Sequence, residues 1–438
     1  MDTLSQLRAG KLAGTRRLDL SCGLEEVPPE VFDLADTLEV LNLTGNRLQS
    51  LPEDFARLQK LRILFCSENR FTHLPEVIGA CPQLSMVGFK ANAIETVADK
   101  ALPSTLRWLI LTDNRIEVLP SSLGRCTRLQ KLMLSGNRLR TLPASMAHCE
   151  NLEMIRLAAN EFEVLPSWLL SLPRLAWLAL AGNPCAPAPA LDSLPSAIDW
   201  NELHLIDLLG EGASGFIHRA HWRATECTQP REVAVKIFKG TMTSDGLPSC
   251  EVAASLTTGA HPNLIEILGR VVHHPSGAPG LVMALIPPEF TSLAGPPSFD
   301  SCTRDVYAHD RTFTADEALR IAQGLAAAAM HLHQHHIMHG DFYAHNVLTN
   351  RTGGCLLGDF GAASFYSSAS DHALQQIEVR AFGYLLEELT SHLATTNPSS
   401  ACIHAMKALQ SECLSLDVAS RPLFPEIQQR LAQMTTHS

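Results

Sequence analysis

Three features that this sequence of 438 residues lacks exclude broad classes of protein. Its twelve cysteines include no C-x-x-C pair, which argues against a zinc site and against a disulfide framework. It has no apolar run long enough to span a bilayer, and its first residues show no apolar signal-peptide segment. Basic residues form no cluster longer than two and the formal net charge is −11, so neither a nucleic acid nor an anionic membrane surface is an expected partner. We therefore expect a cytoplasmic, globular protein.

The first half of the sequence contains a repeat. Asparagines recur at intervals of 22 or 23 residues, each closing the frame L-x-x-L-x-L-x-x-N, and most copies continue with Leu-Pro. The asparagines are Asn46, Asn69, Asn92, Asn114, Asn137, Asn160 and Asn183. Residues 93–103 lack the Leu-Pro signature, and we expect a local irregularity there rather than a domain break.

Over about residues 15–185 this pattern resembles the short leucine-rich repeat family. The resemblance implies an α/β solenoid in which leucines point inward from short parallel strands, while the asparagine side chains satisfy backbone groups where each coil turns. The side chains between the inward leucines would line the concave face, and their apolar and aromatic character indicates an interaction surface. The residues expected to contact a protein partner are Phe65, Met86, Trp108, Ile110, Met133, Met154 and Trp177. The alternative is that this face packs against the second domain of the same chain.

A short segment rich in proline and alanine follows the repeats. Alternating proline and alanine favour an extended spacer. The expected domains are therefore a leucine-rich repeat domain over residues 1–185, a linker over residues 186–199 and a second domain over residues 200–438.

The second half carries short motifs whose order and spacing suit one ATP phosphate-transfer site. A glycine-rich turn, Gly210-x-Gly212-x-x-Gly215, is followed by Val-Ala-Val-Lys, by His-Gly-Asp with an asparagine five residues later, and by Asp-Phe-Gly. A triphosphate is strongly anionic, so its transfer depends on positioning and on charge neutralisation. Backbone amides, a lysine, hard oxygen ligands for Mg²⁺ and a carboxylate base are the groups that this chemistry needs.

With Glu251, a His-Pro-Asn turn at 261–263 and an Arg-Pro pair near the end, these motifs resemble the protein kinase family over residues 200–432. The resemblance implies an α+β bilobal domain after the α/β solenoid, with ATP and Mg²⁺ as cofactors. Asp341 is implied as the catalytic base, Lys236 and Glu251 as the catalytic pair at the phosphates, and Asn346 and Asp359 as metal ligands. The residues implied to bind the nucleotide are Leu209, Gly210, Gly212, Gly215, Ile217, Ala234, Lys236, Met283, Ala284, Ile286 and Leu348.

The chain departs from the kinase pattern in four places. Gly340 stands where an arginine usually precedes the catalytic aspartate, and Tyr343 stands where a lysine usually lies near the γ-phosphate. A protonated His345 would partly compensate for that lysine. The segment after Asp-Phe-Gly is short and lacks A-P-E, and the next helix is expected to start at Glu378. Arg421, which usually pairs with the A-P-E glutamate, therefore needs another partner.

The sequence predicts an ATP- and Mg²⁺-dependent protein kinase that phosphorylates hydroxyl side chains, serine and threonine before tyrosine and including its own, with repeats that bind a protein partner. A pseudokinase scaffold that binds nucleotide without transferring phosphate is one alternative, and a small-molecule kinase, which the His-Gly-Asp motif also suits, is another. The histidines between residues 331 and 339 have spacings that would allow a metal site, although the kinase resemblance gives them structural roles. The oligomeric state stays open.

Overall fold

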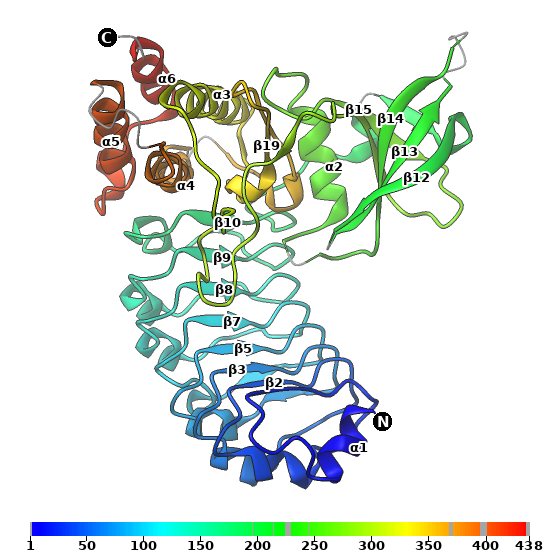
Figure 1. The fold of residues 1–438 in the computed structure, drawn as a ribbon, viewed down its shortest axis with the longest axis vertical. Coiled ribbons are helices and arrows are strands. Elements are labelled where there is room, and N and C mark those ends of the chain that lie inside the picture. The colour runs from blue at the N-terminus through cyan, green and yellow to red at the C-terminus, as the bar shows by residue number, and fades with distance from the viewer. Residues whose placement is uncertain are drawn as a thin grey trace. The chain divides into compact units, whose positions relative to one another are not determined.

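The computed structural model describes residues 2–194, 196–212, 214–223, 229–243, 245–367, 371–394 and 401–434. The chain divides into two compact units, Met1–Leu175 and Ala176–Ser438. Figure 1 colours the first unit blue to cyan and most of the second green to red. Within the described ranges, no helix combines the length and the apolar character needed to cross a membrane.

The first unit is a solenoid of short parallel strands that follow one helix, α1 (Thr3–Arg8). The strands pair in the order β1-β2-β3-β5-β7-β8-β9, and Figure 1 shows them stacked in one row. Their bounds are β1 (Arg17–Asp19), β2 (Val40–Asn42), β3 (Ile63–Phe65), β5 (Met86–Gly88), β7 (Trp108–Ile110), β8 (Lys131–Met133) and β9 (Met154–Arg156).

The register between these strands is constant and explains the core of the solenoid. The central residue of each strand pairs with the central residue of the next, and from β2 onward these residues are Leu41, Leu64, Val87, Leu109, Leu132 and Ile155. All six are fully buried. Alternation along a strand therefore places one apolar column inward, as the repeat pattern predicts.

The asparagine of each repeat closes the turn after the strand. In the copy around Asn137, the side-chain Nδ2 donates to Leu111 O and Leu134 O at 2.9 Å each, while Oδ1 accepts from Ile116 N at 3.0 Å. Buried backbone groups that would otherwise lack partners are thereby satisfied. The same side-chain bonds to neighbouring coils recur at Asn46, Asn69, Asn92, Asn114 and Asn160.

The other edge of the solenoid is formed by 3₁₀ turns and one small sheet. The turns are Pro29–Leu34, Glu53–Arg57, Glu76–Ala80, Asp99–Ala101, Ser121–Arg125, Ala144–His148 and Leu169–Ser171. The small sheet pairs β4 (His73–Leu74) with β6 (Thr96–Val97). Residues 93–103 therefore contain an extra strand and a shortened turn, while β5 and β7 stay paired in register on either side. The prediction of a local irregularity is confirmed.

The second unit begins with β10 (Trp177–Ala179), the strand of the last repeat, and continues with a sheet-rich lobe. Its six strands are ordered β11-β15-β16-β14-β13-β12, and all neighbours are antiparallel except β11 and β15. The bounds are β11 (Ala197–Asp199), β12 (Leu203–Glu211), β13 (Gly215–Trp222), β14 (Arg231–Phe238), β15 (Ile267–Val272) and β16 (Gly280–Ala284), with helix α2 (Pro248–Thr257) beside them. The end of the segment expected as a linker thus forms a strand of this sheet, while Pro195 lies outside the described residues.

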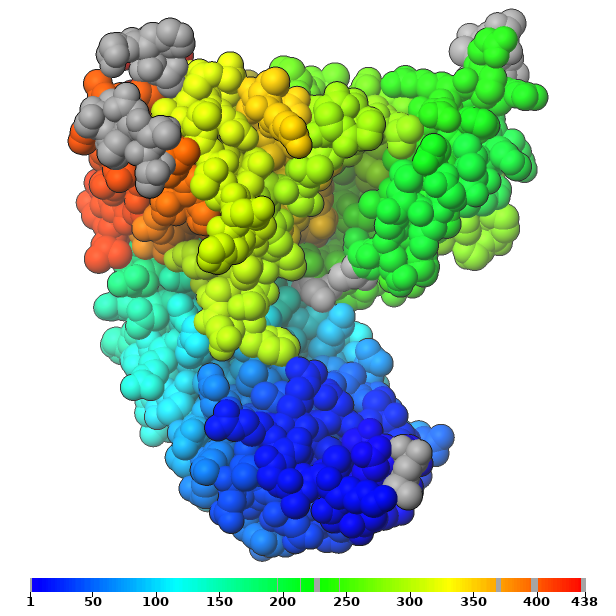
Figure 2. Space-filling view, viewed as in Figure 1, coloured from blue at the N-terminus to red at the C-terminus, as the bar shows by residue number. Residues whose placement is uncertain are grey.

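A helical lobe completes the second unit, and Figure 2 colours the sheet lobe green and the helical lobe yellow to red. Its helices are α3 (Ala315–Gln334), α4 (Asp371–Ser391), α5 (Ala401–Cys413) and α6 (Phe424–Gln433). Two small sheets belong to the same lobe. One has three strands in the order β17 (Thr291–Ser292), β19 (Val347–Thr349) and β20 (Cys355–Leu357), and the other pairs β18 (Ile337–Met338) with β21 (Ser364–Phe365).

The starts of two helices in this lobe have clear local causes. Thr314 caps α3, because its Oγ1 accepts from Glu317 N at 3.1 Å. The expected start of the next helix at Glu378 is wrong, since α4 begins at Asp371. The additional turns bury Leu374 and Ile377, two apolar residues at helical spacing.

Candidate active site

A cavity of about 510 Å³ lies within the second unit, lined by β12 to β14, β16, α2 and the loop that precedes β19. Thirteen residues from the sequence analysis line it: Leu209, Gly212, Gly215, Ile217, Ala234, Lys236, Glu251, Met283, Ala284, Ile286, Asn346, Leu348 and Asp359. Gly210 and Asp341 are not among the lining residues. Ala213, inside the glycine-rich motif, lies outside the described residues.

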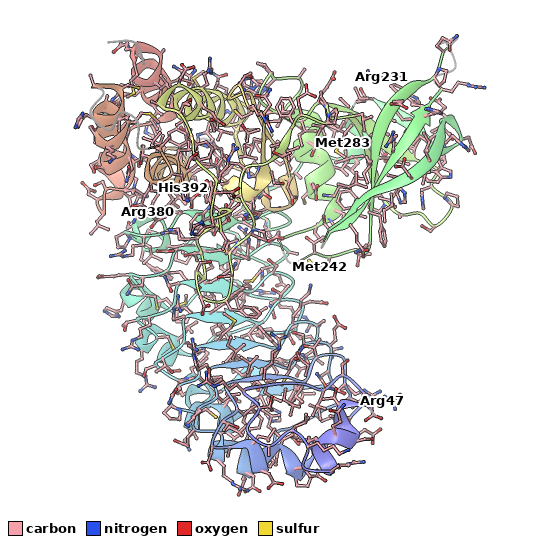
Figure 3. All side chains as sticks on the ribbon, in the orientation of Figure 1. Arg47, Arg231, Met242, Met283, Arg380 and His392 are labelled. Atoms are coloured by element: carbon pink, nitrogen blue, oxygen red, sulfur yellow. The ribbon has the colours of Figure 1, made fainter. Side chains whose placement is uncertain are left out.

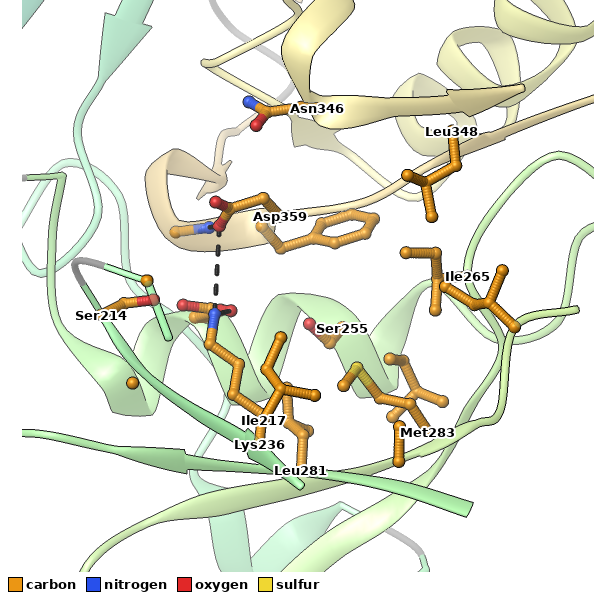
Figure 4. A pocket seen from close by; sticks show the side chains of 18 of the residues that line it. Ser214, Ile217, Lys236, Ser255, Ile265, Leu281, Met283, Asn346, Leu348 and Asp359 are labelled. Atoms are coloured by element: carbon orange, nitrogen blue, oxygen red, sulfur yellow. Dashed lines mark hydrogen bonds and ion pairs between the residues drawn. The ribbon is translucent and has the colours of Figure 1, made fainter. Parts of the chain in front are cut away.

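The cavity has a polar end and an apolar end. Figure 4 shows Lys236 and Asp359 facing each other at one end, and Met283, Leu348 and Ile265 at the other. Three further residues line the cavity that were not predicted from the sequence: Ile265, Ser255 and Leu281. Leu281 could have been found, because it precedes Met283 by two residues on one strand and therefore shares its face.

Lys236 is the centre of the polar end. Its Nζ lies 2.5 Å from Oε1 of Glu251 and 4.0 Å from Oδ1 of Asp359. Lys236 and Glu251 are 8% and 3% exposed, so the pair is shielded from water. A buried pair of this geometry fixes the ammonium and aims it into the cavity.

Burial and charge act in opposite directions on this pair. Burial alone would lower the pKa of Lys236, but the carboxylates of Glu251 and Asp359 raise that pKa above its ordinary value. Burial raises the pKa of Glu251 to about 7, with the Lys236 ammonium opposing the shift. The lysine is therefore held in its charged form, and Glu251 is the group that titrates near neutrality.

Helix α2 positions Glu251. Glu251 lies in the first turn of α2. A carboxylate in the first turn is favoured by the unpaired backbone N–H groups there. Pro248 at the start of α2 suits the same turn, since its missing N–H would have no partner inside the helix.

Asp341 and Asn346 form a second polar group beside the cavity. The Nδ2 of Asn346 donates to the backbone O of Asp341 at 2.9 Å and to its side-chain Oδ2 at 2.8 Å. Asp341 N donates to His339 Nδ1 at 3.3 Å, and the other ring nitrogen of this fully buried histidine faces Gly358 O at 2.9 Å. His339 therefore ties the loop that carries Asp341 to the strand that leads into Asp359.

Asp359 has a strained backbone. Its φ and ψ are 55° and 80°, in the left-handed region, and its Oδ1 accepts from Gly361 N at 3.2 Å. Aspartate tolerates this conformation better than most residues because its side chain can bond locally. Its side chain is 52% exposed, so it is accessible to a ligand in the cavity.

His345 also lines the cavity, and its partner comes from a distant segment. Its Nδ1 lies 2.7 Å from Oδ1 of Asp305, and its backbone N donates to Asp305 Oδ2 at 2.9 Å. Burial alone would lower the pKa of His345, but the hydrogen bond and charge of the buried Asp305 carboxylate raise it above the ordinary value. The structure thus favours the protonated histidine that the sequence analysis considered in place of a lysine at position 343.

Glu378 and Arg421 have partners that the sequence did not indicate. Glu378 Oε1 accepts from Gly340 N at 2.8 Å, and Oε2 lies 2.7 Å from His333 Nε2. Burial would raise the pKa of Glu378, but the His333 bond lowers it below the ordinary value. The buried Arg421 donates to two carbonyls, Ser415 O at 3.0 Å and Gln376 O at 2.9 Å, in place of an A-P-E glutamate.

Burial of Arg421 also changes its pKa. Its pKa is lowered to about 10 by burial and by the nearby Arg380, which Figure 3 labels on α4. Arg380 itself donates to Leu414 O at 2.6 Å and to the Tyr384 hydroxyl at 3.0 Å. The two arginines therefore hold the end of α5 against α4 through carbonyl groups.

Trp177 corrects one part of the predicted partner surface. It is 1% exposed, and within its own unit it stacks on Tyr343 with ring centroids 4.1 Å apart. For this residue the alternative of packing against the chain's own second domain is right. Met86 and Met154 are 4% and 3% exposed, so the prediction that they contact a partner is wrong for these two buried side chains as well. The remaining residues of the predicted surface are partly exposed: Phe65, Trp108, Ile110 and Met133.

The histidine tract makes hydrogen bonds with the protein. His331 Nε2 lies 2.7 Å from Thr258 O, His335 Nδ1 lies 2.9 Å from His331 O, and His333 and His339 have the partners given above. In the part of the chain that the structure describes, no group of three or more His, Cys, Asp or Glu residues is arranged to hold a metal ion.

Comparison with known proteins agrees with this geometry. A family model for protein tyrosine and serine/threonine kinases matches residues 203–399, and a leucine-rich repeat model matches residues 13–71, 104–162 and 127–184.

Three curated relatives show the same two kinds of similarity. A "Probable serine/threonine-protein kinase" from Dictyostelium discoideum is 26% identical over 165 residues, which cover 37% of this chain and 9% of that protein. A volume-regulated anion channel subunit from Homo sapiens is 34% identical over 123 residues, 27% of this chain and 13% of that protein. Serine/threonine-protein kinase A-Raf from Sus scrofa is 24% identical over 284 residues, 52% of this chain and 42% of that protein. The chain spans less than half the length of each of these relatives. It carries leucine-rich repeats followed by a protein kinase domain of the tyrosine and serine/threonine kinase family.

Proposed function

We propose that this protein is an ATP- and Mg²⁺-dependent serine/threonine kinase, and that its repeats bind a protein partner. The observation that carries the proposal is the Lys236–Glu251 pair at 2.5 Å with Asp359 at 4.0 Å, at the polar end of an otherwise apolar cavity. An adenine ring suits the apolar end, and a triphosphate suits a fixed ammonium. Leu209, Ile217, Ala234 and Leu348 would enclose the ring, and backbone groups of Ala284 and Ile286 would bond its edge.

The residues present fit a magnesium ion. Asp359 offers an accessible carboxylate, and in the view of Figure 4 Asn346 lies beyond it as seen from Lys236. Since Nδ2 of Asn346 donates to Asp341, its amide oxygen is the atom left to face a cation. One or two protein oxygens completed by phosphate oxygens are the usual ligands of Mg²⁺. When bound there, the ion would neutralise phosphate charge during transfer.

Asp341 would accept the proton of the attacking hydroxyl. The Asn346 amide holds its Oδ2 at 2.8 Å, which would orient the carboxylate for the hydroxyl of the acceptor. Lys236 would hold the phosphates, and a protonated His345 would add positive charge on the side where Tyr343 replaces a lysine. These steps use one carboxylate, one ammonium and one imidazolium, all fixed by hydrogen bonds before substrate binds.

The repeats supply the proposed partner surface. Partly exposed apolar side chains lie on strands β3, β7 and β8 of the strand row: Phe65, Trp108, Ile110 and Met133. The ammonium of the buried Lys131 lies 4.3 Å from the centroid of the Trp108 ring, a cation–π contact that holds this indole in place. Aromatic and methionine side chains are enriched where proteins bind each other.

Transfer of labelled phosphate from Mg·ATP tests the function. The protein is incubated alone, with a general protein acceptor and with a panel of hydroxylated metabolites, and any labelled residue is identified. We expect label on serine or threonine of a protein, including the kinase itself. Label only on a metabolite would instead support a small-molecule kinase, and nucleotide binding with no transfer to any acceptor would support a scaffold.

A further inference from the structure

The indole ring of Trp177 stacks with two tyrosines of the second unit. Its centroid is 4.1 Å from that of Tyr343 with an interplanar angle of 5°, and 5.4 Å from that of Tyr384 at 17°. Its Nε1 donates to Phe342 O at 3.2 Å. The guanidinium of Arg304 lies 3.4 Å from the Tyr384 ring centroid and 5.5 Å from that of Trp177. Stacking and a buried hydrogen bond therefore hold residues 342 and 343 from one side.

The backbone of Tyr343 passes this constraint on to the proposed catalytic groups. Its N–H donates to Asp341 O at 2.8 Å, and its carbonyl accepts from Asn346 N at 3.2 Å. Asn346 in turn holds Oδ2 of Asp341 at 2.8 Å. A continuous set of contacts thus joins the indole of Trp177 to the carboxylate proposed as the base.

The residue that follows β10 makes a second contact, with the segment after Asp359. Leu180 N donates to Ser364 Oγ at 2.8 Å, and Ser364 Oγ donates to Ala362 O at 3.2 Å. Ser364 also begins β21, which pairs with β18 directly before His339. The end of the last repeat therefore touches both the loop that carries Asp341 and the segment that follows Asp359.

The packing around position 340 explains why a glycine stands next to the proposed base. Its φ is 74°, and a Cβ there would lie 2.5 Å from Ala362 O and 2.7 Å from Leu178 O. The backbone of β10 therefore occupies the space that a side chain at position 340 would need. The two departures from the kinase pattern inside the catalytic loop, Gly340 and Tyr343, both face β10.

We propose that β10 supports the loop that carries Asp341 in the kinase domain, and that Trp177 is a positioning residue for Asp341 and Asn346. The proposal rests on the proposed phosphotransfer function. The segment after Asp359-Phe-Gly is short and lacks A-P-E, so it offers few contacts to the loop, and the last repeat supplies them instead. Fixing a catalytic group before substrate binds raises the rate of the chemical step more than it changes substrate affinity.

Full-length Trp177→Ala and Trp177→Phe test this role, with kcat and the KM for Mg·ATP measured for each. Loss of the stack in Trp177→Ala should lower kcat by about tenfold and leave the KM within about twofold. Trp177→Phe keeps an aromatic ring for the stack and loses the N–H and the second ring of the indole, so it should restore kcat to within about threefold of wild type. Trp168→Ala is the matched control, because Trp168 is a half-buried tryptophan of the first unit outside this cluster, and it should leave kcat unchanged.

Hydrogen–deuterium exchange of peptides covering residues 339–349 gives a readout that does not need activity. The amides of Tyr343 and Asn346 should exchange at least about tenfold faster in Trp177→Ala than in wild type or in Trp168→Ala. An unchanged kcat and unchanged exchange in Trp177→Ala would overturn the proposal. So would a kcat loss that Trp177→Phe fails to restore.

The test stays decisive if a variant does not fold and if the wild-type protein is inactive. Should Trp177→Ala fail to fold, Ser364→Ala replaces it and should lower kcat at an unchanged KM, because it removes the hydroxyl that accepts from Leu180 N and donates to Ala362 O. An unchanged kcat in that variant counts against the proposal. Should the wild-type protein transfer no phosphate, the proposed function fails, and the exchange rates decide this inference alone.

Discussion

The ammonium of Lys236 and the carboxylate of Glu251 lie 2.5 Å apart in a site where both residues are almost fully buried. In such a place the pair functions only when both groups are charged, because a neutral Glu251 no longer fixes the ammonium electrostatically. Burial raises the pKa of Glu251 to about 7, so its proton, rather than that of the lysine, decides when the pair forms.

The first prediction is a pH dependence that comes from Glu251. kcat/KM for Mg·ATP should rise between pH 6 and 8 with a midpoint near the Glu251 pKa of about 7. The pKa of Glu251 is higher in the folded protein than the ordinary 4.5, so its protonated form stabilises the fold. This contribution to stability is fully present below pH 4.5 and is lost as the pH rises through about 7. Activity should therefore rise over the pH range in which stability falls. Glu251→Gln should lower kcat/KM and remove this rise. The same rise in Glu251→Gln would show that another group titrates.

The second prediction concerns the His345–Asp305 contact. The Asp305 carboxylate raises the pKa of His345, so Asp305→Asn should lower that pKa. Titration of the His345 ring proton by NMR measures the change, and kcat should begin to fall at a lower pH in this variant than in wild type. Asp199→Asn is the control, because Asp199 faces the exposed His273 at 2.7 Å and should leave His345 unaffected. An unshifted His345 in Asp305→Asn would refute the assignment.

The third prediction compares two glycines with similar backbone angles. Gly340 and Gly259 have φ values of 74° and 64°, but a Cβ would clash only at Gly340, since nothing lies within 4 Å at Gly259. Gly259→Ala should cost only the backbone strain, about 1 kcal/mol, whereas Gly340→Ala should cost about 2–4 kcal/mol. Urea unfolding of each variant measures the difference. Equal losses would mean that Leu178 O and Ala362 O can move aside.

The fourth prediction concerns the asparagine ladder. Asn137→Ala removes two bonds that the side chain donates and one that it accepts, and leaves buried backbone groups unpaired. It should lower the free energy of unfolding by about 2–4 kcal/mol. Asn151→Ala, at an exposed asparagine whose one bond goes to Thr127 O, should change it by less than about 0.5 kcal/mol. A small effect at Asn137 would mean that water replaces the side chain.

Much of the fold could be predicted because its signals are local. The period of 22 or 23 residues determines the strand row, and each asparagine acts within its own and the adjacent coils. Lys236 and Asp359 come from distant segments, but each lies in a short motif that fixes its place in the fold, and the structure brings both together with Glu251.

The contacts of Trp177 could not be predicted in the same way. Its indole bonds a carbonyl 165 residues away, and no motif links the two positions. Repeat periodicity correctly predicted that Trp177 belongs to the strand row. It also predicted an exposed side chain, whereas the indole is buried against Tyr343. Gly340 and Tyr343 were visible as departures from the kinase pattern, but the reason for both is the tertiary packing of β10. The early start of α4 was missed for a similar reason, since burial of Leu374 and Ile377 extends that helix.

The most direct test of the account separates nucleotide binding from phosphate transfer in two variants. Mg·ATP affinity is measured by calorimetry and transfer by labelled phosphate, for wild type, Asp341→Asn and Lys236→Met. We predict that Asp341→Asn binds Mg·ATP within about threefold of wild type and transfers phosphate about 10²–10⁴-fold more slowly, because only the base is lost. Lys236→Met should weaken both binding and transfer. Wild-type transfer by Asp341→Asn, or binding without any transfer by the wild-type protein, would contradict the proposed kinase.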